Sequence, residues 1–385
     1  MTARVYALVI LALVSAVLLM LTLTSGATFT APTANPSNQL ATATLAAPTA
    51  VSAIVQSNGG TVRVAWTATS STWASGHRVL RATNAGGPFS QIQQIAGRAT
   101  VIYDDVPGVG TFFYVVRGYY NANGANWESV NSAQASAKPL DHFTFDAIAT
   151  QQSGTAFNVT ITAQAQDNST VTGFTGTVNL ATNGGSIAPA TSGAFVAGVR
   201  TESTTITGPY KANQTITATG GSPSRTGTSA VFVLDHFRAT AIALANGGTT
   251  AGRIQTGDTI TITFSEAANT ATLGTCGVGN SGNDIAANDA NPDTLTANGA
   301  ALAFGTVTLG DNGYLTSADA PKNSTCAWTA GNTVLTITLV SVTPGKTATV
   351  AGGSTATYLP NATITSATGQ AIDTAQTPSV TAVLF

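Results

Sequence analysis

Hydrophobic and polar positions alternate along most of this chain in short runs. Runs in which Thr alternates with Val, Ile or Leu are especially clear, and they cover residues 61–66, 157–162, 259–264 and 333–339. β-Branched residues at a two-residue period are typical of strands with one buried face. Clusters of Gly, Asn, Ser and Pro separate the runs, and no long stretch keeps the period of an amphipathic helix. The pattern predicts an all-β chain built from antiparallel sandwiches.

A four-residue motif that occurs twice indicates the length of one sandwich. Residues 140–143 read Leu-Asp-His-Phe, and the same four residues return at 234–237. This spacing is close to the roughly 100 residues of an immunoglobulin-like sandwich. We therefore predict a first module over residues 46–139, a second module over 140–233 and a larger third module over 234–385.

The N-terminus has the pattern of an export signal. Arg4 precedes an uncharged, apolar run over residues 5–23, and small residues follow at 25–27. The sequence predicts a signal peptide over residues 1–27, followed by an Ala/Thr/Pro linker over 28–45. The apolar run also approaches the roughly 20 residues that span a bilayer, so an uncleaved anchor helix is the alternative. Either interpretation places the remaining chain outside the cell.

Charged residues are scarce. The 385 residues include 14 Lys+Arg and 16 Asp+Glu, which is 8% of the chain, against roughly a quarter in ordinary soluble domains. The net charge of −2 lacks the basic footprint that binding to nucleic acid requires. Few charges also mean less protection against pairing between strand edges, so we expect the chain to be able to self-associate.

The first module resembles a fibronectin type III domain. Trp66 ends the second apolar run, where that family has its core Trp, and residues 76–81 resemble its third strand. His77 stands where the family commonly has Tyr. Phe112 stands at the position of a corner Tyr whose hydroxyl bonds back to the backbone. The resemblance therefore implies that Tyr114 would have to supply this hydroxyl.

The second and third modules resemble immunoglobulin-like domains of bacterial surface proteins. Residues 173–180 and 214–219 carry the resemblance in the second module, and residues 258–266 carry it in the third. The whole chain is thus similar to exported bacterial multi-domain surface proteins in which a fibronectin type III domain precedes bacterial Ig-like domains. The resemblance implies a structural or adhesive role without enzymatic activity.

The two cysteines, Cys276 and Cys326, both lie in the third module. In an exported chain, a lone pair of cysteines most simply forms a disulfide. Closing a loop of about 50 residues would stabilise the fold by roughly 4 kcal/mol in the chain-entropy model. The alternative is a pair of reduced, buried thiols.

Asp284, Asp289 and Asp293 belong to the densest acidic group of the chain, and Asn residues lie among them. Carboxylate and carbonyl oxygens are the ligands that Ca²⁺ prefers, so these residues are the candidate calcium ligands and calcium is the candidate cofactor. Their spacing fits no EF-hand. The alternative is a solvated loop, because Asp and Asn favour turns.

Trp73 lies in a Ser/Thr-rich loop and is the candidate for stacking against a sugar; the alternative is local packing. His142 and His236 each follow an Asp, which suggests a catalytic pair. Because both occupy the same place in a repeated motif, we expect them to make contacts between modules instead. The chain has neither a Gly-x-Ser-x-Gly nor a His-Glu-x-x-His motif, so no catalytic set is recognisable.

Two functional hypotheses follow. The first is a secreted or cell-surface structural or adhesive protein, not an enzyme, whose partners are further copies of itself, other surface proteins or glycans. The second is a carbohydrate-binding accessory protein or a non-catalytic part of an extracellular hydrolase system. Both exclude nucleic acid as a partner, and both limit membrane contact to the N-terminal segment if it is uncleaved.

Overall fold

The computed structural model describes most of the chain after the predicted signal and linker segments. Residues from Leu45 to Phe385 form one compact unit. Among the described residues, no helix is long and apolar enough to cross a membrane, and the predicted signal peptide lies outside them. The described residues are 44–122, 125–274, 285–297, 302–315, 323–342, 349–350, 352–382 and 384–385.

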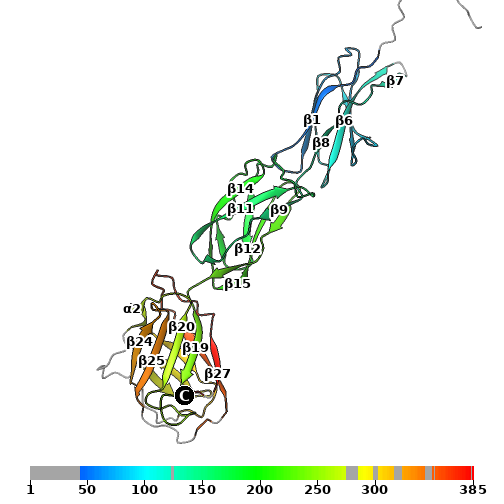
Figure 1. The fold of residues 1–385 in the computed structure, drawn as a ribbon. Helices are drawn as coiled ribbons and strands as arrows, with labels where there is room; N and C mark the ends of the chain where they lie inside the picture. The colour runs from blue at the N-terminus through cyan, green and yellow to red at the C-terminus, as the bar shows by residue number, and fades with distance from the viewer. Residues whose placement is uncertain are drawn as a thin grey trace, which may run out of the picture. The chain divides into compact units, whose positions relative to one another are not determined.

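The first module is a sandwich of two antiparallel sheets (Figure 1). One sheet has the order β1-β2-β5. The other has the order β4-β3-β6-β7, with β8 also paired to β6. This strand order is that of a fibronectin type III sandwich, as the sequence predicts. The strands are β1 (Thr49–Val55), β2 (Val62–Thr67), β3 (Gly76–Ala82), β4 (Ser90–Ala96), β5 (Ile102–Asp105), β6 (Phe112–Ala122), β7 (Ala125–Glu128) and β8 (Ala135–Ala137).

The core of the first module contains the aromatic residues that the sequence places there. Trp66 is buried, and Phe112 and Tyr114 project from β6 into the same cluster. The Tyr114 hydroxyl donates a hydrogen bond of 2.9 Å to Oδ2 of Asp105, which also pairs with Arg81 at 2.8 Å. Tyr114 therefore supplies the hydroxyl that Phe112 lacks, although it bonds a side chain and not the backbone. Burial raises the pKa of Tyr114, with the Asp105 carboxylate adding to the shift.

His77 stands where fibronectin type III domains, which the first module resembles in strand order, commonly have Tyr. Its side chain is fully buried, and its ring meets the Trp66 ring edge-on with 5.5 Å between centroids. The Thr69 backbone N–H donates to Nε2 at 3.3 Å. Burial lowers the pKa of His77 below its ordinary 6.5, and the positive charge of Arg98 adds to the shift. The buried imidazole is therefore neutral at pH 7.

We expect acidification to destabilise the first module through His77. Below the unfolded-state pKa of 6.5, the unfolded chain binds a proton that the folded chain excludes. The contribution of His77 to stability is therefore present above pH 6.5 and declines as the pH falls towards the lowered folded-state pKa. Hydrogen exchange of strands β2 and β3 between pH 7.5 and 5 would measure it. His77→Phe keeps a ring against Trp66 without a titrating group, so equal pH dependence in this variant would contradict the assignment.

The second module contains three sheets, in the orders β13-β14-β11-β9, β12-β16-β17 and β10-β18-β15. All pairs are antiparallel except β10 with β18. Its core includes three phenylalanines in mutual contact, Phe143, Phe174 and Phe195. The strands are β9 (His142–Phe145), β10 (Gln151–Gln152), β11 (Ala156–Gln164), β12 (Val178–Thr182), β13 (Ser186–Ala188), β14 (Val199–Thr207), β15 (Lys211–Gln214), β16 (Ile216–Gly220), β17 (Arg225–Thr228) and β18 (Phe232–Asp235).

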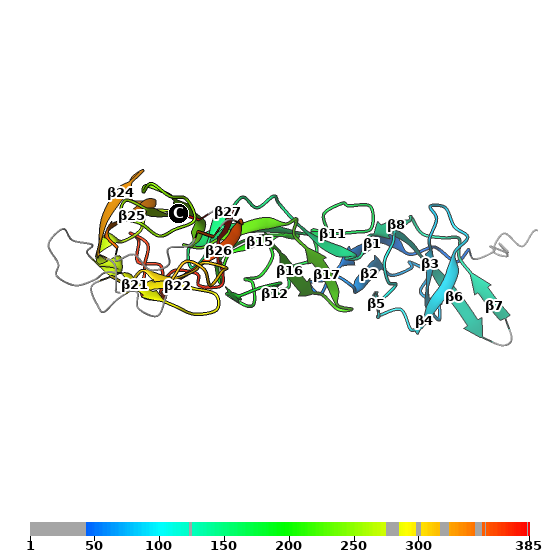
Figure 2. The same cartoon turned by 90° about the horizontal axis from the view of Figure 1, so that it is seen from below.

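The third module is a sandwich of two antiparallel sheets, in the orders β19-β20-β25-β24 and β21-β22-β23-β26-β27 (Figures 1 and 2). Its one described helix, α2 (Thr270–Leu273), has Asn269 as N-cap. The strands are β19 (Ala239–Ala245), β20 (Thr259–Phe264), β21 (Ile285–Asn288), β22 (Thr294–Ala297), β23 (Gly305–Thr308), β24 (Asn323–Thr329), β25 (Val334–Ser341), β26 (Ser354–Pro360) and β27 (Ser379–Ala382).

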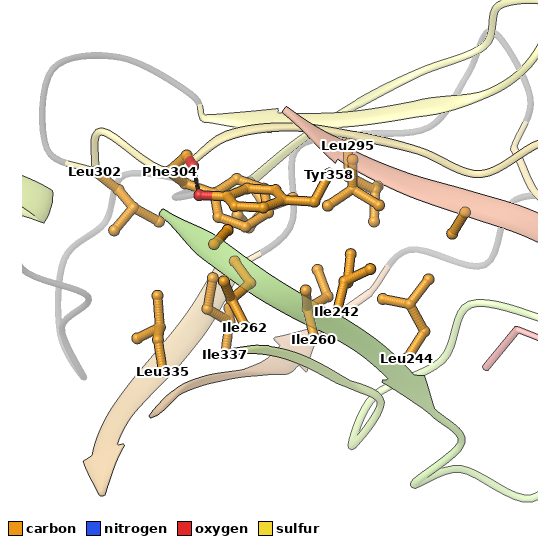
Figure 3. Close-up of a cluster of buried hydrophobic side chains, with 14 of the residues drawn as sticks. Ile242, Leu244, Ile260, Ile262, Leu295, Leu302, Phe304, Leu335, Ile337 and Tyr358 are labelled. Carbon is orange, nitrogen blue, oxygen red and sulfur yellow. Dashed lines mark hydrogen bonds between the residues drawn. The ribbon is translucent and has the colours of Figure 1, made fainter. Parts of the chain in front are cut away.

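Side chains from both sheets of the third module meet in an apolar core (Figure 3). Ile260 and Ile337 come from neighbouring strands of one sheet, and Tyr358 comes from the other. All three are fully buried. The Tyr358 hydroxyl donates a hydrogen bond of 2.6 Å to the carbonyl oxygen of Phe304, so the one polar atom of this ring is satisfied. Phe385 is buried in the same core.

The repeated motif marks the places where the chain enters a new core. Leu140 and Phe143 both lie in the core of the second module, and the Leu140 N–H donates to the Gly59 carbonyl at 2.8 Å. In the second copy, Leu234 remains in that same core, whereas Phe237 begins the core of the third module. The three residue ranges proposed from the sequence remain the definitions of the modules used below.

Candidate functional site

An aromatic cluster at one end of the first module is the candidate binding site. Trp73, Tyr120 and Trp127, which we call the aromatic cluster, lie in mutual contact. The ring centroids of Trp73 are 5.3 Å from Tyr120 and 6.3 Å from Trp127, and Tyr120 and Trp127 are 5.5 Å apart. Trp127 is 55% exposed, while Trp73 and Tyr120 are half-buried. The structure thus joins the predicted Trp73 to two further aromatic residues.

Strand alternation explains why two of these rings meet. Tyr114 and Val116 on β6 face the core, and Tyr120 lies on the same side of the strand because side chains alternate with a period of two. Tyr120 pairs with Trp127 across the β6–β7 hairpin, so both side chains lie on one face. Neither belongs to the core cluster of the module. The hairpin therefore carries an aromatic face outside that core.

The loop between β2 and β3 holds Trp73 in place. Two residues after Trp73, the Ser75 N–H donates to the Tyr119 carbonyl at 2.8 Å, and Ser75 Oγ accepts the Asn121 N–H at 2.9 Å. The chain then passes so close to β4 that a Cβ on Gly76 would lie 2.0 Å from the Ile95 carbonyl oxygen. Only glycine fits there, so any other residue would shift the loop that carries Trp73.

A charged network stabilises the opposite face of the same hairpin. Arg78 pairs with Glu128, and its Nη2 donates to Oδ1 of Asn126 at 3.2 Å. Arg117 donates to the second carboxylate oxygen of Glu128 at 2.7 Å. Asn126 and Glu128 flank Trp127 in sequence, so their side chains point away from the aromatic face. The charges stabilise the hairpin and leave the aromatic face uncharged.

Each ring of the aromatic cluster also carries a hydrogen-bond donor. These are the indole N–H groups of Trp73 and Trp127 and the hydroxyl of Tyr120. Within the described part of the chain, no protein acceptor is found for any of the three. Aromatic side chains with an apolar face and an unused donor are suited to a ligand that has both apolar and hydroxylated surfaces.

The structure gives Asp293 a structural role in the region of the predicted calcium ligands. Its carboxylate is buried and accepts backbone N–H groups from Tyr314 and Leu315, both at 2.9 Å, and from Ala290 at 3.3 Å. Asp289 is exposed, and Asp284 lies outside the described residues. No group of three or more His, Cys, Asp or Glu side chains suited to a metal occurs among the residues the structure describes. Calcium binding by this loop remains a prediction.

The predicted disulfide involves one described residue. Cys326 lies on β24, half-buried, and packs against the core of the third module. Cys276 lies outside the described residues. The pairing of these cysteines therefore remains a prediction from the sequence.

The two motif histidines differ in their contacts. His142 Nδ1 lies 2.9 Å from Oδ2 of Asp141, and its Nε2 lies 3.2 Å from Oε1 of Gln164. His236 instead contacts the Phe237 carbonyl, and the neighbouring Asp235 pairs with Arg238. The His–Asp arrangement of the first copy is therefore not repeated in the second. The side-chain hydrogen bonds of both histidines are to residues of their own modules, so they supply none of the expected contacts between modules.

Comparisons with known proteins give likenesses of fold only. No protein-family model matches the chain, and no curated protein matches it. An Fn3-like protein from Clostridium thermocellum is 31% identical over 24% of this chain and 92% of its own, with a TM-score of 0.21. Domains 4–9 of the surface layer protein SbsC are 13% identical, over 86% of this chain and 45% of theirs, with a TM-score of 0.23.

The FN1–FN3 domains of chicken CNTN1 are 8% identical, over 88% of this chain and 99% of theirs, with a TM-score of 0.21. TM-scores this low carry no argument about function. The assignment as tandem Fn3/Ig-like sandwiches rests on the strand orders and cores described above.

Proposed function

We propose that this chain is a secreted or cell-surface structural protein, without enzymatic activity, that associates with further copies of itself through the open edge of β4. The tandem β-sandwiches support the structural role in this proposal. The apolar N-terminal run and the scarcity of charge support a place outside the cell. The observation that carries the proposal is the character of β4.

Strand β4 ends the sheet β4-β3-β6-β7, and no described residue pairs with its outer side. It reads Ser-Gln-Ile-Gln-Gln-Ile-Ala and contains no charge and no proline. Ile92 and Ile95 pack against the core, while Gln91, Gln93 and Gln94 are exposed. An uncharged edge with glutamine side chains can accept another strand and can align amide groups between copies.

Two other edges of the first module are protected by charge. Strand β5 carries the exposed Asp104, and strand β7 carries Glu128. Charged side chains on an edge oppose the addition of a neighbouring strand. A register shift between Val79 and Leu80 twists β4 locally but adds no charge. Of these three edges, β4 is therefore the one best suited to pair with another copy.

Contacts between consecutive modules support a structural role. The Ser222 N–H donates to the Asn58 carbonyl at 2.9 Å, and Val55 packs against both the first and the second core. Gln370 of the third module donates to the Ser153 carbonyl at 2.8 Å and accepts the Phe237 N–H at 3.0 Å. Such bonds link residues of consecutive modules, which supports a structural role.

Self-association through β4 predicts that Gln93→Lys weakens assembly of the Leu45–Phe385 unit at least tenfold. The lysines of two paired copies would lie close together in the new sheet and repel each other. Sedimentation velocity over a concentration series measures the change. Because the edge is uncharged, we expect assembly of the native sequence to be nearly unaffected by salt up to about 1 M.

Thr219→Lys is the matched control, since it adds the same charge to β16, a strand with partners on both sides. Its assembly should equal that of the native sequence. A native chain that stays monomeric at every concentration, or equal weakening by both variants, would refute pairing through β4. Immunogold electron microscopy of intact cells tests the surface location independently.

A further inference from the structure

We infer that the aromatic cluster of Trp73, Tyr120 and Trp127 binds a neutral pyranose unit of a polysaccharide. This is a binding activity beyond the proposed structural role, and it uses the opposite end of the sheet from the open edge of β4. Four observations carry the inference: exposure of the rings, unused donors, absence of charge on the aromatic face and a prearranged loop.

Exposure of a large aromatic side chain is unusual in this protein. Trp127 is the one aromatic residue among the exposed large hydrophobic side chains of the described residues. The others are Val, Ile and Leu residues distributed along the chain. Trp127 is 55% exposed although it contacts two further aromatic rings. Part of its apolar ring surface therefore remains in contact with water, which is unfavourable. A ligand that covers the Trp127 ring would recover this free energy.

The chemistry of the cluster matches a sugar ring. A pyranose has apolar C–H faces and a rim of hydroxyl groups. The ring faces of Trp127 and Tyr120 can cover the C–H face, and the unused N–H and O–H donors can bond the rim. Thr72, which is exposed, and Ser75, which is half-buried, lie beside Trp73 in the same loop and add hydroxyl groups near the cluster. A small aromatic area with a polar surround suits a sugar better than a protein partner, which needs a wider apolar contact.

The distribution of charge favours a neutral sugar. Arg78 and Arg117 lie on the other face of the hairpin, where both pair with Glu128. These two arginines therefore lie on the wrong side of the hairpin to hold a carboxylated or sulfated sugar at the aromatic face. Neutral units such as glucose or N-acetylglucosamine fit this environment.

The site is formed before any ligand arrives. Ser75 ties the Trp73 loop to the end of β6, and Gly76 allows the close approach of that loop to β4. The pairing of Tyr120 with Trp127 holds the other two rings. Binding therefore orders few groups, which reduces its entropic cost.

Titration of the Leu45–Phe385 unit with cellohexaose and with chitohexaose tests the inference. This unit contains all three described cores. We expect at least one of the two to shift the indole N–H signals of Trp73 and Trp127 in NMR spectra at about 1 mM ligand. Trp127→Ala should weaken binding about tenfold or more, and Trp127→Phe, which keeps a ring but loses the N–H, should weaken it less.

Val130→Ala is the control, because Val130 is 79% exposed near β7 and is not part of the cluster. It should bind as the native sequence does. Near-ultraviolet circular dichroism checks that each variant is folded, and Trp127→Phe keeps the test informative if Trp127→Ala is not. The inference is wrong if neither sugar shifts the indole signals, or if Trp127→Ala binds normally. A Trp127→Ala variant that loses self-association but keeps sugar binding would likewise refute it, and would assign the cluster to a protein contact.

Discussion

Replacing Phe174 with alanine is expected to destabilise the second module by about 3–5 kcal/mol. Phe174 is fully buried, and its ring centroid lies 5.4 Å from that of Phe143 and 5.0 Å from that of Phe195. Its removal loses burial of one ring and two edge-to-face contacts at once. The remaining two rings come from separate segments of the module, so they cannot close the cavity without moving backbone.

Hydrogen exchange followed by mass spectrometry is the suitable measurement, because unfolding of a three-module chain is not a single two-state transition. For amides of β11 and β14, the free energy of opening should fall by the whole amount that the second module loses. Amides of the third module should keep their protection. Phe157→Ala is the control. Phe157 is half-buried, and its one ring contact is with Phe232 at 6.3 Å. Equal losses in the two variants would contradict a core centred on Phe174.

The sequence predicts the strands because alternation is a local property. The run at 157–162 becomes part of β11 (Ala156–Gln164), and the run at 259–264 becomes β20 (Thr259–Phe264). In β20, the isoleucines are fully buried and the threonines between them are half-exposed, as a two-residue period requires. One buried face per strand is sufficient to specify an all-β fold of packed sheets.

The aromatic cluster was only partly predictable, because it depends on pairing across a hairpin. Trp73 can be selected from the sequence because it lies in a polar loop. No residue near it in sequence indicates that it contacts Tyr120 and Trp127. The pairing of Tyr120 with Trp127 could have been predicted. Asn123-Gly124, which lies midway between them, is a dipeptide typical of a tight hairpin turn. The contact of Trp73 with this pair depends on how the β2–β3 loop meets the end of β6, which no sequence period encodes.

In the acidic loop around Asp293, the sequence suggests a binding site but does not show what the carboxylates contact. Composition alone suggests a metal site, since Asp and Asn oxygens are the ligands of calcium. Whether a carboxylate faces a cation or the backbone is decided by tertiary contacts. In Asp293 both carboxylate oxygens accept backbone N–H groups, and its own N–H donates to the Asp311 carbonyl at 2.8 Å. Tyr314, Leu315 and Asp311 come from a segment about 20 residues further along the chain, whereas Ala290 is a local partner.

Asp293→Ala is therefore expected to cost the third module about 3 kcal/mol, whether or not calcium is present. The change leaves the N–H groups of Tyr314 and Leu315 buried without an acceptor, at roughly 1–3 kcal/mol for each. Asp289→Ala removes an exposed carboxylate of the same loop and should change stability by no more than about 0.5 kcal/mol.

Hydrogen exchange at the amides of Tyr314 and Leu315, with calcium and with a chelator, distinguishes a backbone acceptor from a calcium ligand. If the carboxylate acts as a backbone acceptor, these amides lose protection in the Asp293 variant alone and the chelator has no effect. If calcium binds here, the chelator reproduces the loss in the native chain and Asp289→Ala weakens the response.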